Sequence, residues 1–215
     1  MRSRSLLFVS AAASAVYLLT QHWRPYPGSP LIKGCAVGAL ALFAFGWRKE
    51  KRDAALLSLG LAFSTAGDVV LDLGEQFFVF GLLAFLFAHI SYITLFVRNR
   101  RSKVTVGAPG VVAVALVVAY SASLSAWIVP AVGGLAGPVV FYICAITSMV
   151  SAAILGRFAS RWVAVGALLF LISDSLLAIH KFKTPVPMRD TLVGLTYYLG
   201  QCGIALGYLA GAGSR

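Results

Sequence analysis

Long uncharged apolar runs constrain the fold of this chain more than any other feature. Several windows extend for about 18 residues or more without a charged side chain, which is the length a helix needs to cross the ~30 Å hydrocarbon core of a bilayer. Of the 215 residues, 60% are hydrophobic and only 12% are charged. Ordinary soluble domains carry about a quarter charged residues. The sequence therefore predicts an all-α, polytopic integral membrane protein.

The apolar windows between polar breaks predict eight transmembrane helices in a single domain, residues 1–215. Segments rich in Pro and Gly, such as RPYPGSP and GGLAGP, separate the windows. The stretch 121–136 is ambiguous, because Trp127 and Pro130 can belong to a span or to an interfacial loop. The expected spans are 5–22, 31–47, 54–73, 77–96, 105–124, 137–156, 162–181 and 191–211.

The basic residues are distributed unevenly between the two ends of these spans. With eight spans, thirteen Lys and Arg residues fall on the side of the termini and five on the other side. Basic residues are enriched in cytoplasmic loops, so both termini are expected in the cytoplasm, with a bacterial inner membrane as the expected location. The thirteen are Arg2, Arg4, Arg48, Lys49, Lys51, Arg52, Arg98, Arg100, Arg101, Lys103, Arg157, Arg161 and Arg215.

The same clustering explains the net charge of +11 without a nucleic-acid partner, because the clusters are short and lie between apolar runs. The first apolar run continues to Leu19 without a polar cleavage region, which favours a retained helix over a signal peptide.

The three cysteines, Cys35, Cys144 and Cys202, lie within apolar runs at spacings that fit no metal motif. We interpret them as small core residues and expect no metal and no cofactor.

Two aspartates stand out in the segment FSTAGDVVLD. The whole chain has only seven acidic residues, yet Asp68 and Asp72 lie four residues apart in an apolar span, on one helix face. A carboxylate near the centre of a membrane helix costs roughly 2.5–3.5 kcal/mol on insertion scales, so such residues are candidates for function or for pairing. Asp174 is expected at nearly the depth of Asp68, about 10 Å against about 7 Å from the same membrane surface.

Each candidate also has a structural interpretation. Asp68 or Asp174 can pair with Lys33 simply to hold helices together. Asp72 is near enough to the interface to be solvated, where it would line an entrance. The other polar candidates within the spans can equally form packing contacts or interhelical hydrogen bonds. These are Ser64, His89, Tyr142, Ser173, Tyr197 and Gln201.

The two halves of the chain share a weak internal similarity. GLAFSTAGDVVL (60–71) and GALLFLISDSLL (166–177) have Gly, Asp and Leu at the same relative positions, and Tyr92 and Tyr198 keep the same offset. A tandem repeat of four helices in each half would produce this pattern. Chance similarity between apolar helices is the alternative.

Taken in order, four pieces resemble the YhhN-type lysoplasmalogenase family: FSTAGDVVL, FVFGLLAFLFAHISY (78–92), GALLFLISDSLLA (166–178) and TYYLGQCGIALG (196–207). Lys33 also resembles that family's lysine, and the resemblance covers essentially the whole chain. It implies an eight-helix membrane enzyme whose substrate is a lysophospholipid or other ether lipid. The implied reaction is hydrolysis of the vinyl ether bond of a lysoplasmalogen to a fatty aldehyde and a glycerophospho head group.

This chemistry suits the polar residues within the spans. Vinyl ether hydrolysis needs an acid that protonates the alkenyl carbon and a carboxylate that stabilises the resulting cation and activates water, as paired carboxyl groups do in glycosidases. The hypothesis assigns Asp68 and Asp174 to this catalytic pair. The expected substrate-binding residues are Lys33, Ser64, Asp72, His89, Tyr92, Tyr142, Ser173, Tyr197 and Gln201.

Three other functions stay open on the sequence alone. Two intramembrane carboxylates and a tandem repeat also suit a small-solute or proton-coupled transporter. His89 with the aspartates would suit a metal-dependent lipid amidohydrolase, and a structural or lipid-binding role is the third alternative.

The small residues of GALALFAFG (38–46) can pack helices within one chain or between two.

Overall fold

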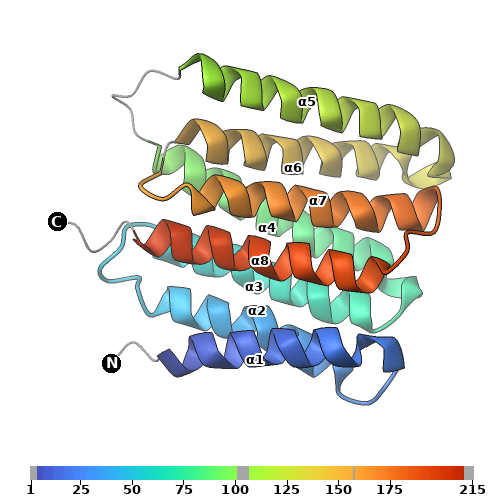
Figure 1. Ribbon diagram of the computed structural model, residues 1–215, viewed down its shortest axis with the longest axis horizontal. Coiled ribbons are helices and arrows are strands. Elements are labelled where there is room, and N and C mark those ends of the chain that lie inside the picture. The colour runs from blue at the N-terminus through green and yellow to red at the C-terminus, as the bar shows by residue number, and fades with distance from the viewer. Residues whose placement is uncertain (1–3, 101–106, 157, 211–215) are drawn as a thin grey trace. The chain divides into compact units, whose positions relative to one another are not determined.

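The computed structural model describes residues 4–100, 107–156 and 158–210, and its long elements are all α-helices (Figure 1). Each predicted span overlaps one of them, with ends within four residues of the prediction. Short 3-10 turns η1 (Gln21–Trp23), η2 (Glu75–Phe77), η3 (Val129–Ala131) and η4 (Gly133–Leu135) lie in the connections. The helices are α1 (Arg4–Thr20), α2 (Ser29–Phe45), α3 (Ala54–Asp72), α4 (Phe78–Arg98), α5 (Ala108–Ile128), α6 (Ala136–Gly156), α7 (Trp162–Phe182) and α8 (Arg189–Ala210).

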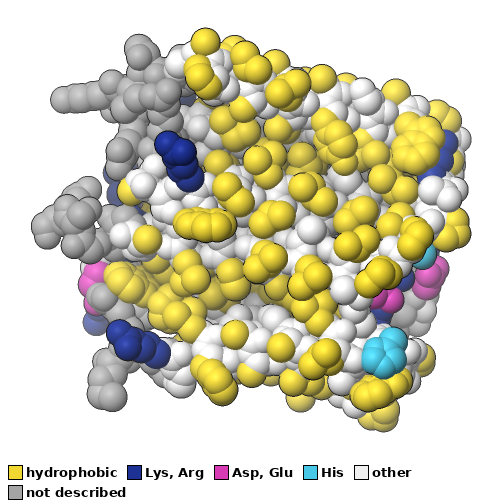
Figure 2. All heavy atoms as spheres, viewed as in Figure 1, with side chains coloured by type: hydrophobic (Ala, Val, Ile, Leu, Met, Phe, Trp, Pro, Cys, Tyr) yellow, Lys and Arg dark blue, Asp and Glu magenta, His cyan; other side chains and the backbone are white. Residues whose placement is uncertain are grey.

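The helices have the length and surface of membrane-spanning segments. Among the described residues, seven helical segments are long and apolar enough to cross a bilayer, and α2, with 17 residues, is a shorter apolar helix. Figure 2 shows apolar side chains covering the helices, with charged side chains near the helix ends. The all-α polytopic prediction is therefore confirmed, and the chain is an integral membrane protein.

Two details differ from the sequence interpretation or resolve it. Trp127 belongs to α5, whereas Pro130 lies in η3 beyond its end. Cys35 and Cys144 are exposed, so the interpretation of the cysteines as core residues is wrong for these two. In a membrane an exposed apolar position faces hydrocarbon, so burial in the protein is not needed to keep a cysteine out of water.

Five of the basic residues used to predict the orientation lie outside the described residues: Arg2, Arg101, Lys103, Arg157 and Arg215.

The described chain divides into two compact units. The first contains the chain up to Leu95 with Leu209 and Ala210, and the second extends from Phe96 to Tyr208. Within the first unit α2 packs against both α1 and α3, and within the second unit α6 packs against both α5 and α7. Each unit therefore has a central helix between its neighbours in the chain, as expected when short connections join antiparallel helices.

Glycines allow α7 and α8 to approach closely in the second unit. A Cβ atom on Gly166 would lie 2.6 Å from both the carbonyl oxygen of Gly200 and the amide nitrogen of Ile204. Gly203 and Gly207 of α8 also face the backbone of α7. Small residues in membrane helices permit this backbone contact, which supplies the dispersion energy that holds such helices together.

The third and fourth helices of each unit meet at glycines that correspond in the predicted repeat. Gly60 of α3 faces the ring of Tyr92 on α4, since a Cβ atom there would lie 2.6 Å from Cε1. Gly166, 106 residues later, faces α8 in the second unit. The tandem repeat stays a prediction, and these two packing sites support it.

Gly166→Ala should lower the stability of the protein. The added methyl group meets backbone atoms that cannot move aside, and overpacking of this kind costs about 1–3 kcal/mol. Thermal unfolding of the detergent-solubilised protein measures the effect. Gly137→Ala on α6 is the matched control, because nothing lies within 4 Å of its added methyl and Ala is the better helix former. Equal melting temperatures for the two variants would contradict the close α7–α8 packing.

Candidate functional site

Asp72, the last residue of α3, is bound by three hydrogen-bond donors in the first unit. The Tyr17 hydroxyl and the Arg24 guanidinium Nη1 each donate to Oδ1 at 2.6 Å. The Ser29 hydroxyl donates to Oδ2 at 2.5 Å. The Asp72 side chain has no exposed surface, so the expectation that it is solvated is wrong. We call Tyr17, Arg24, Ser29 and Asp72 the Asp72 cluster.

The connection between α1 and α2 builds this cluster. Tyr17 lies in the last turn of α1, and Ser29 is the first residue of α2. Arg24 lies between them, so three side chains within thirteen residues donate hydrogen bonds to Asp72 of α3. A hydrogen bond of 2.6 Å between the hydroxyls of Thr20 and Tyr26 closes the same connection. The donors satisfy a carboxylate that would otherwise be buried at high cost.

One turn deeper on α3, Asp68 pairs with Lys33 of α2. Their Oδ1 and Nζ atoms are 3.7 Å apart, and the Asp68 side chain is only 3% exposed. The Lys33 ammonium also lies 5.5 Å from the centre of the Tyr17 ring, and the Arg24 guanidinium lies at the same distance from that ring. Tyr17 therefore links the Asp72 cluster to the Lys33–Asp68 pair through hydrogen-bond and cation–π contacts.

The second unit holds its own hydrogen-bonded carboxylate. The Tyr142 hydroxyl of α6 donates to Oδ2 of Asp174 on α7 at 2.5 Å. The neighbouring Ser173 hydroxyl donates to the Val193 carbonyl oxygen at 3.1 Å and so ties α7 to α8. The rings of Phe170 and Tyr197 meet edge to face, with centres 5.3 Å apart. Asp174 thus has the buried Tyr142 of α6 as its partner, and buried aromatic rings join α7 to α8 nearby in sequence.

The structure brings together two pairs of sequence-predicted residues, Lys33 with Asp68 and Tyr142 with Asp174. The first pair belongs to the first unit and the second pair to the second. The remaining predicted residues are buried in the unit that holds them: Ser64, His89 and Tyr92 in the first, and Gln201 in the second. Within the described residues, no group of three His, Cys, Asp or Glu side chains could hold a metal ion.

Sequence reasoning missed Tyr17, Arg24 and Ser29. Arg24 carried the one usable signal, because it lies on the side of the membrane that has few basic residues. A cation on that side needs a local reason, and Asp72 and Glu75 were both carboxylates at a similar expected depth. Neither Tyr17 nor Ser29 differs in its sequence context from an ordinary interfacial residue.

A model of the YhhN family matches residues 28–208. The chain belongs to the YhhN family. This confirms the resemblance inferred from the sequence motifs.

Relatives of this chain from a mycobacterium and from mammals are both named lysoplasmalogenase. A protein named lysoplasmalogenase from Mycobacterium bovis is 38% identical over 186 residues, covering 79% of this chain and 69% of the relative. Lysoplasmalogenase TMEM86A of Homo sapiens is 33% identical over 212 residues, covering 90% and 84%. No solved structure matches the chain significantly.

Arg24→Gln should destabilise the protein by about 1–3 kcal/mol, because an enclosed Asp72 loses a charged donor. The double variant Arg24→Gln, Asp72→Asn should recover at least half of that loss, since the neutral amide needs no cation. Chemical or thermal unfolding of the solubilised protein measures both effects.

Arg52→Gln is the matched control, because Arg52 is 74% exposed beside Asp53 and such pairs contribute little. A double variant no more stable than the single one would show that the Arg24–Asp72 contact does not hold the cluster together.

Proposed function

We propose that this YhhN-family protein is a membrane-embedded hydrolase that cleaves the vinyl ether bond of a lysoplasmalogen. The products are a fatty aldehyde and a glycerophospho head group. The observation that carries the proposal is the shared name of its relatives, lysoplasmalogenase, at 33–38% identity over most of the chain. Two carboxylates within membrane helices, the buried Asp68 and the part-buried Asp174, each have a donor partner and support it independently.

The reaction requires an acid and a carboxylate. Protonation of the alkenyl carbon that is β to the ether oxygen gives an oxocarbenium ion at the neighbouring carbon. Water adds to this ion and loses a proton, which gives a hemiacetal. The hemiacetal then collapses: its hydroxyl loses a proton to form the aldehyde carbonyl, the bond to the glycerol oxygen breaks, and that oxygen takes up a proton to leave as the alcohol. Each proton consumed is matched by one released, so a pair of carboxyl groups can complete the cycle without a cofactor.

Asp68 and Asp174 are the proposed catalytic carboxyl groups. Both lie within helices among apolar neighbours, where a charge is tolerated only with a partner. The Lys33 ammonium provides that partner for Asp68, and the Tyr142 hydroxyl orients Asp174. The proposed substrate-binding residues are Lys33, Ser64, Asp72, His89, Tyr92, Tyr142, Ser173, Tyr197 and Gln201.

The membrane setting supports the proposed substrate and orientation. A single-chain lysophospholipid lies in the bilayer with its head group at the surface, so an enzyme within the membrane can meet its ether bond without extracting it. The uneven distribution of basic residues supports termini in the cytoplasm. A bacterial inner membrane is the proposed location.

Asp68→Asn and Asp174→Asn should each lower aldehyde release by about 10²–10⁴-fold, the usual contribution of a positioned acid or base. The assay uses purified protein with an alkenyl lysophospholipid and its ester-linked counterpart. Wild-type protein should release aldehyde from the alkenyl lipid only. Asp53→Asn is the matched control, because Asp53 lies in the α2–α3 connection with a φ of 57°, which Asn also adopts readily. Full activity in both aspartate variants would remove this mechanism.

Tyr142→Phe should reduce kcat by about 10–100-fold with little change in KM. It removes one hydrogen bond to a carboxylate while leaving the ring in place, and hydrogen bonds to charged groups contribute about 1.5–3 kcal/mol. Steady-state aldehyde release measures both constants. Tyr120→Phe on the exposed face of α5 is the matched control. Unchanged kcat in Tyr142→Phe would show that the hydroxyl does not orient Asp174 for the reaction.

A further inference from the structure

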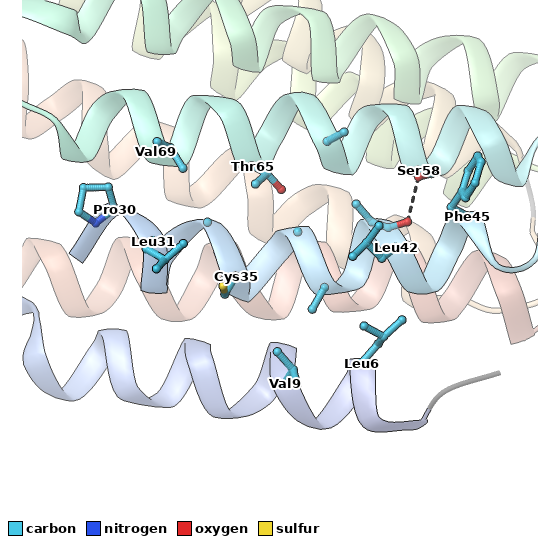
Figure 3. A pocket seen from close by; sticks show the side chains of 15 residues that line it. Leu6, Val9, Pro30, Leu31, Cys35, Leu42, Phe45, Ser58, Thr65 and Val69 are labelled. Carbon is cyan, nitrogen blue, oxygen red and sulfur yellow. Dashed lines mark hydrogen bonds between the residues drawn. The ribbon is translucent and has the colours of Figure 1, made fainter. Parts of the chain in front are cut away.

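The first unit has an apolar groove that lies over α2 between α1 and α3 (Figure 3). Its volume is about 790 Å³. Figure 3 places Pro30 and Val69 toward one end, and Leu42, Phe45 and Leu6 toward the other. None of the proposed catalytic or substrate-binding residues lines it. The lining residues are Leu6, Val9, Pro30, Leu31, Gly34, Cys35, Gly38, Ala39, Ala41, Leu42, Phe45, Ser58, Ala62, Thr65 and Val69.

The groove offers hydrocarbon contacts rather than hydrogen bonds. Its two hydroxyl side chains are satisfied within the protein. The Ser58 hydroxyl donates to the Ala41 carbonyl oxygen at 2.9 Å, and the Thr65 hydroxyl donates to the Leu61 carbonyl oxygen at 2.8 Å. An occupant therefore gains nothing from polar groups of its own along the groove, and an alkyl chain is the chemistry that fits.

A helix from a second copy fits the groove less well. Helices pack closely in membranes where small residues are free to receive a partner's backbone. Here α3 already packs against Gly34 and Gly38. A Cβ atom on Gly34 would lie 2.9 Å from Val69 Cγ2. A Cβ atom on Gly38 would lie 3.4 Å from Thr65 Cγ2. These two glycine positions of α2 are thus used inside the unit.

One end of the groove is basic. The Arg48 guanidinium lies 4.1 Å from the centre of the Phe45 ring, which lines the groove. Arg48 is exposed and has no carboxylate partner among the described residues. Its guanidinium donates a hydrogen bond to the Phe45 carbonyl oxygen. Lys49 follows it and is also exposed, and Arg4 begins α1 two residues before Leu6. The apolar lining therefore ends beside exposed basic side chains, at the end of the helices where lipid head groups lie.

We propose that this groove binds one hydrocarbon chain of an anionic phospholipid, with the lipid phosphate against Arg48. The chain runs along α2 from Phe45 to Cys35. Ten helical residues span about 15 Å, which is half of the ~30 Å hydrocarbon core and hence the depth of one leaflet. Juxtamembrane basic residues attract anionic lipids by about a fivefold preference each. The bound lipid fills the space between α1 and α3, so it is a structural ligand separate from the substrate.

Native mass spectrometry of the full-length protein in detergent tests the proposal, with phosphatidylglycerol and phosphatidylcholine of identical chains as probes. The wild-type protein should retain one phosphatidylglycerol at least about fivefold more strongly than phosphatidylcholine. Arg48→Gln should lower that preference about fivefold. Arg161→Gln, an exposed basic residue of the second unit, is the matched control and should keep it. Glycerol 3-phosphate should not displace the lipid, because it lacks the chain.

Two blocking variants test the groove itself. Ala62 and Leu42 both line it and are exposed, so Ala62→Trp and Leu42→Trp fill the groove without disturbing buried packing. Each should lower retention of both lipids at least fivefold. Unchanged retention in both would overturn the proposal, as would equal binding of the two lipids by the wild type. A dimer that disappears in the blocking variants would assign the groove to a second copy instead.

Discussion

The cost of a charge in hydrocarbon governs how the carboxylates within the described membrane helices are placed. A carboxylate inside a membrane helix is tolerated only when donors or a cation compensate for the water it has lost. Asp72 meets this requirement with three donors, Asp68 has Lys33, and Asp174 has the Tyr142 hydroxyl. The arrangement of α1, α2 and α3 in the first unit, and of α6 and α7 in the second, places these partners.

Close helix packing makes such exact placement possible. Glycines at the third and fourth helices of each unit let a ring or a backbone segment approach without an intervening side chain. Side chains that project from closely packed helices have few rotamers left, so a hydroxyl can be held against one carboxylate oxygen. An acid–base reaction on a lipid depends on such precise placement of a few groups more than on the number of polar groups in the site.

The helices followed from the sequence because bilayer thickness sets their length and composition. That Lys33 has a carboxylate partner also followed, since an isolated charge in an apolar run needs an explanation, but the choice of Asp68 over Asp174 came from the structure. The Asp72 cluster did not follow, because its donors lie 43 to 55 residues away in sequence. Depth along α3 predicts the distance of Asp72 from the membrane surface, but it does not predict which side chains the neighbouring connection brings over it.

The groove over α2 was not predictable for a related reason. Its lining residues are as apolar as any lipid-facing surface, and only the positions of α1 and α3 turn that surface into a hollow. The basic cluster that begins at Arg48 was interpreted from sequence as a topology signal. In the structure it also ends an apolar groove, so one set of residues can serve orientation and lipid binding.

The central claim is that the protein protonates an alkenyl carbon within the membrane. The most direct measurement is hydrolysis of an alkenyl lysophospholipid by the purified protein in D₂O, with mass spectrometry of the aldehyde trapped at early times. We expect one deuterium on the carbon next to the carbonyl group, above the exchange seen when unlabelled aldehyde is incubated alone. Aldehyde without that deuterium, or no aldehyde from folded protein, would contradict the claim.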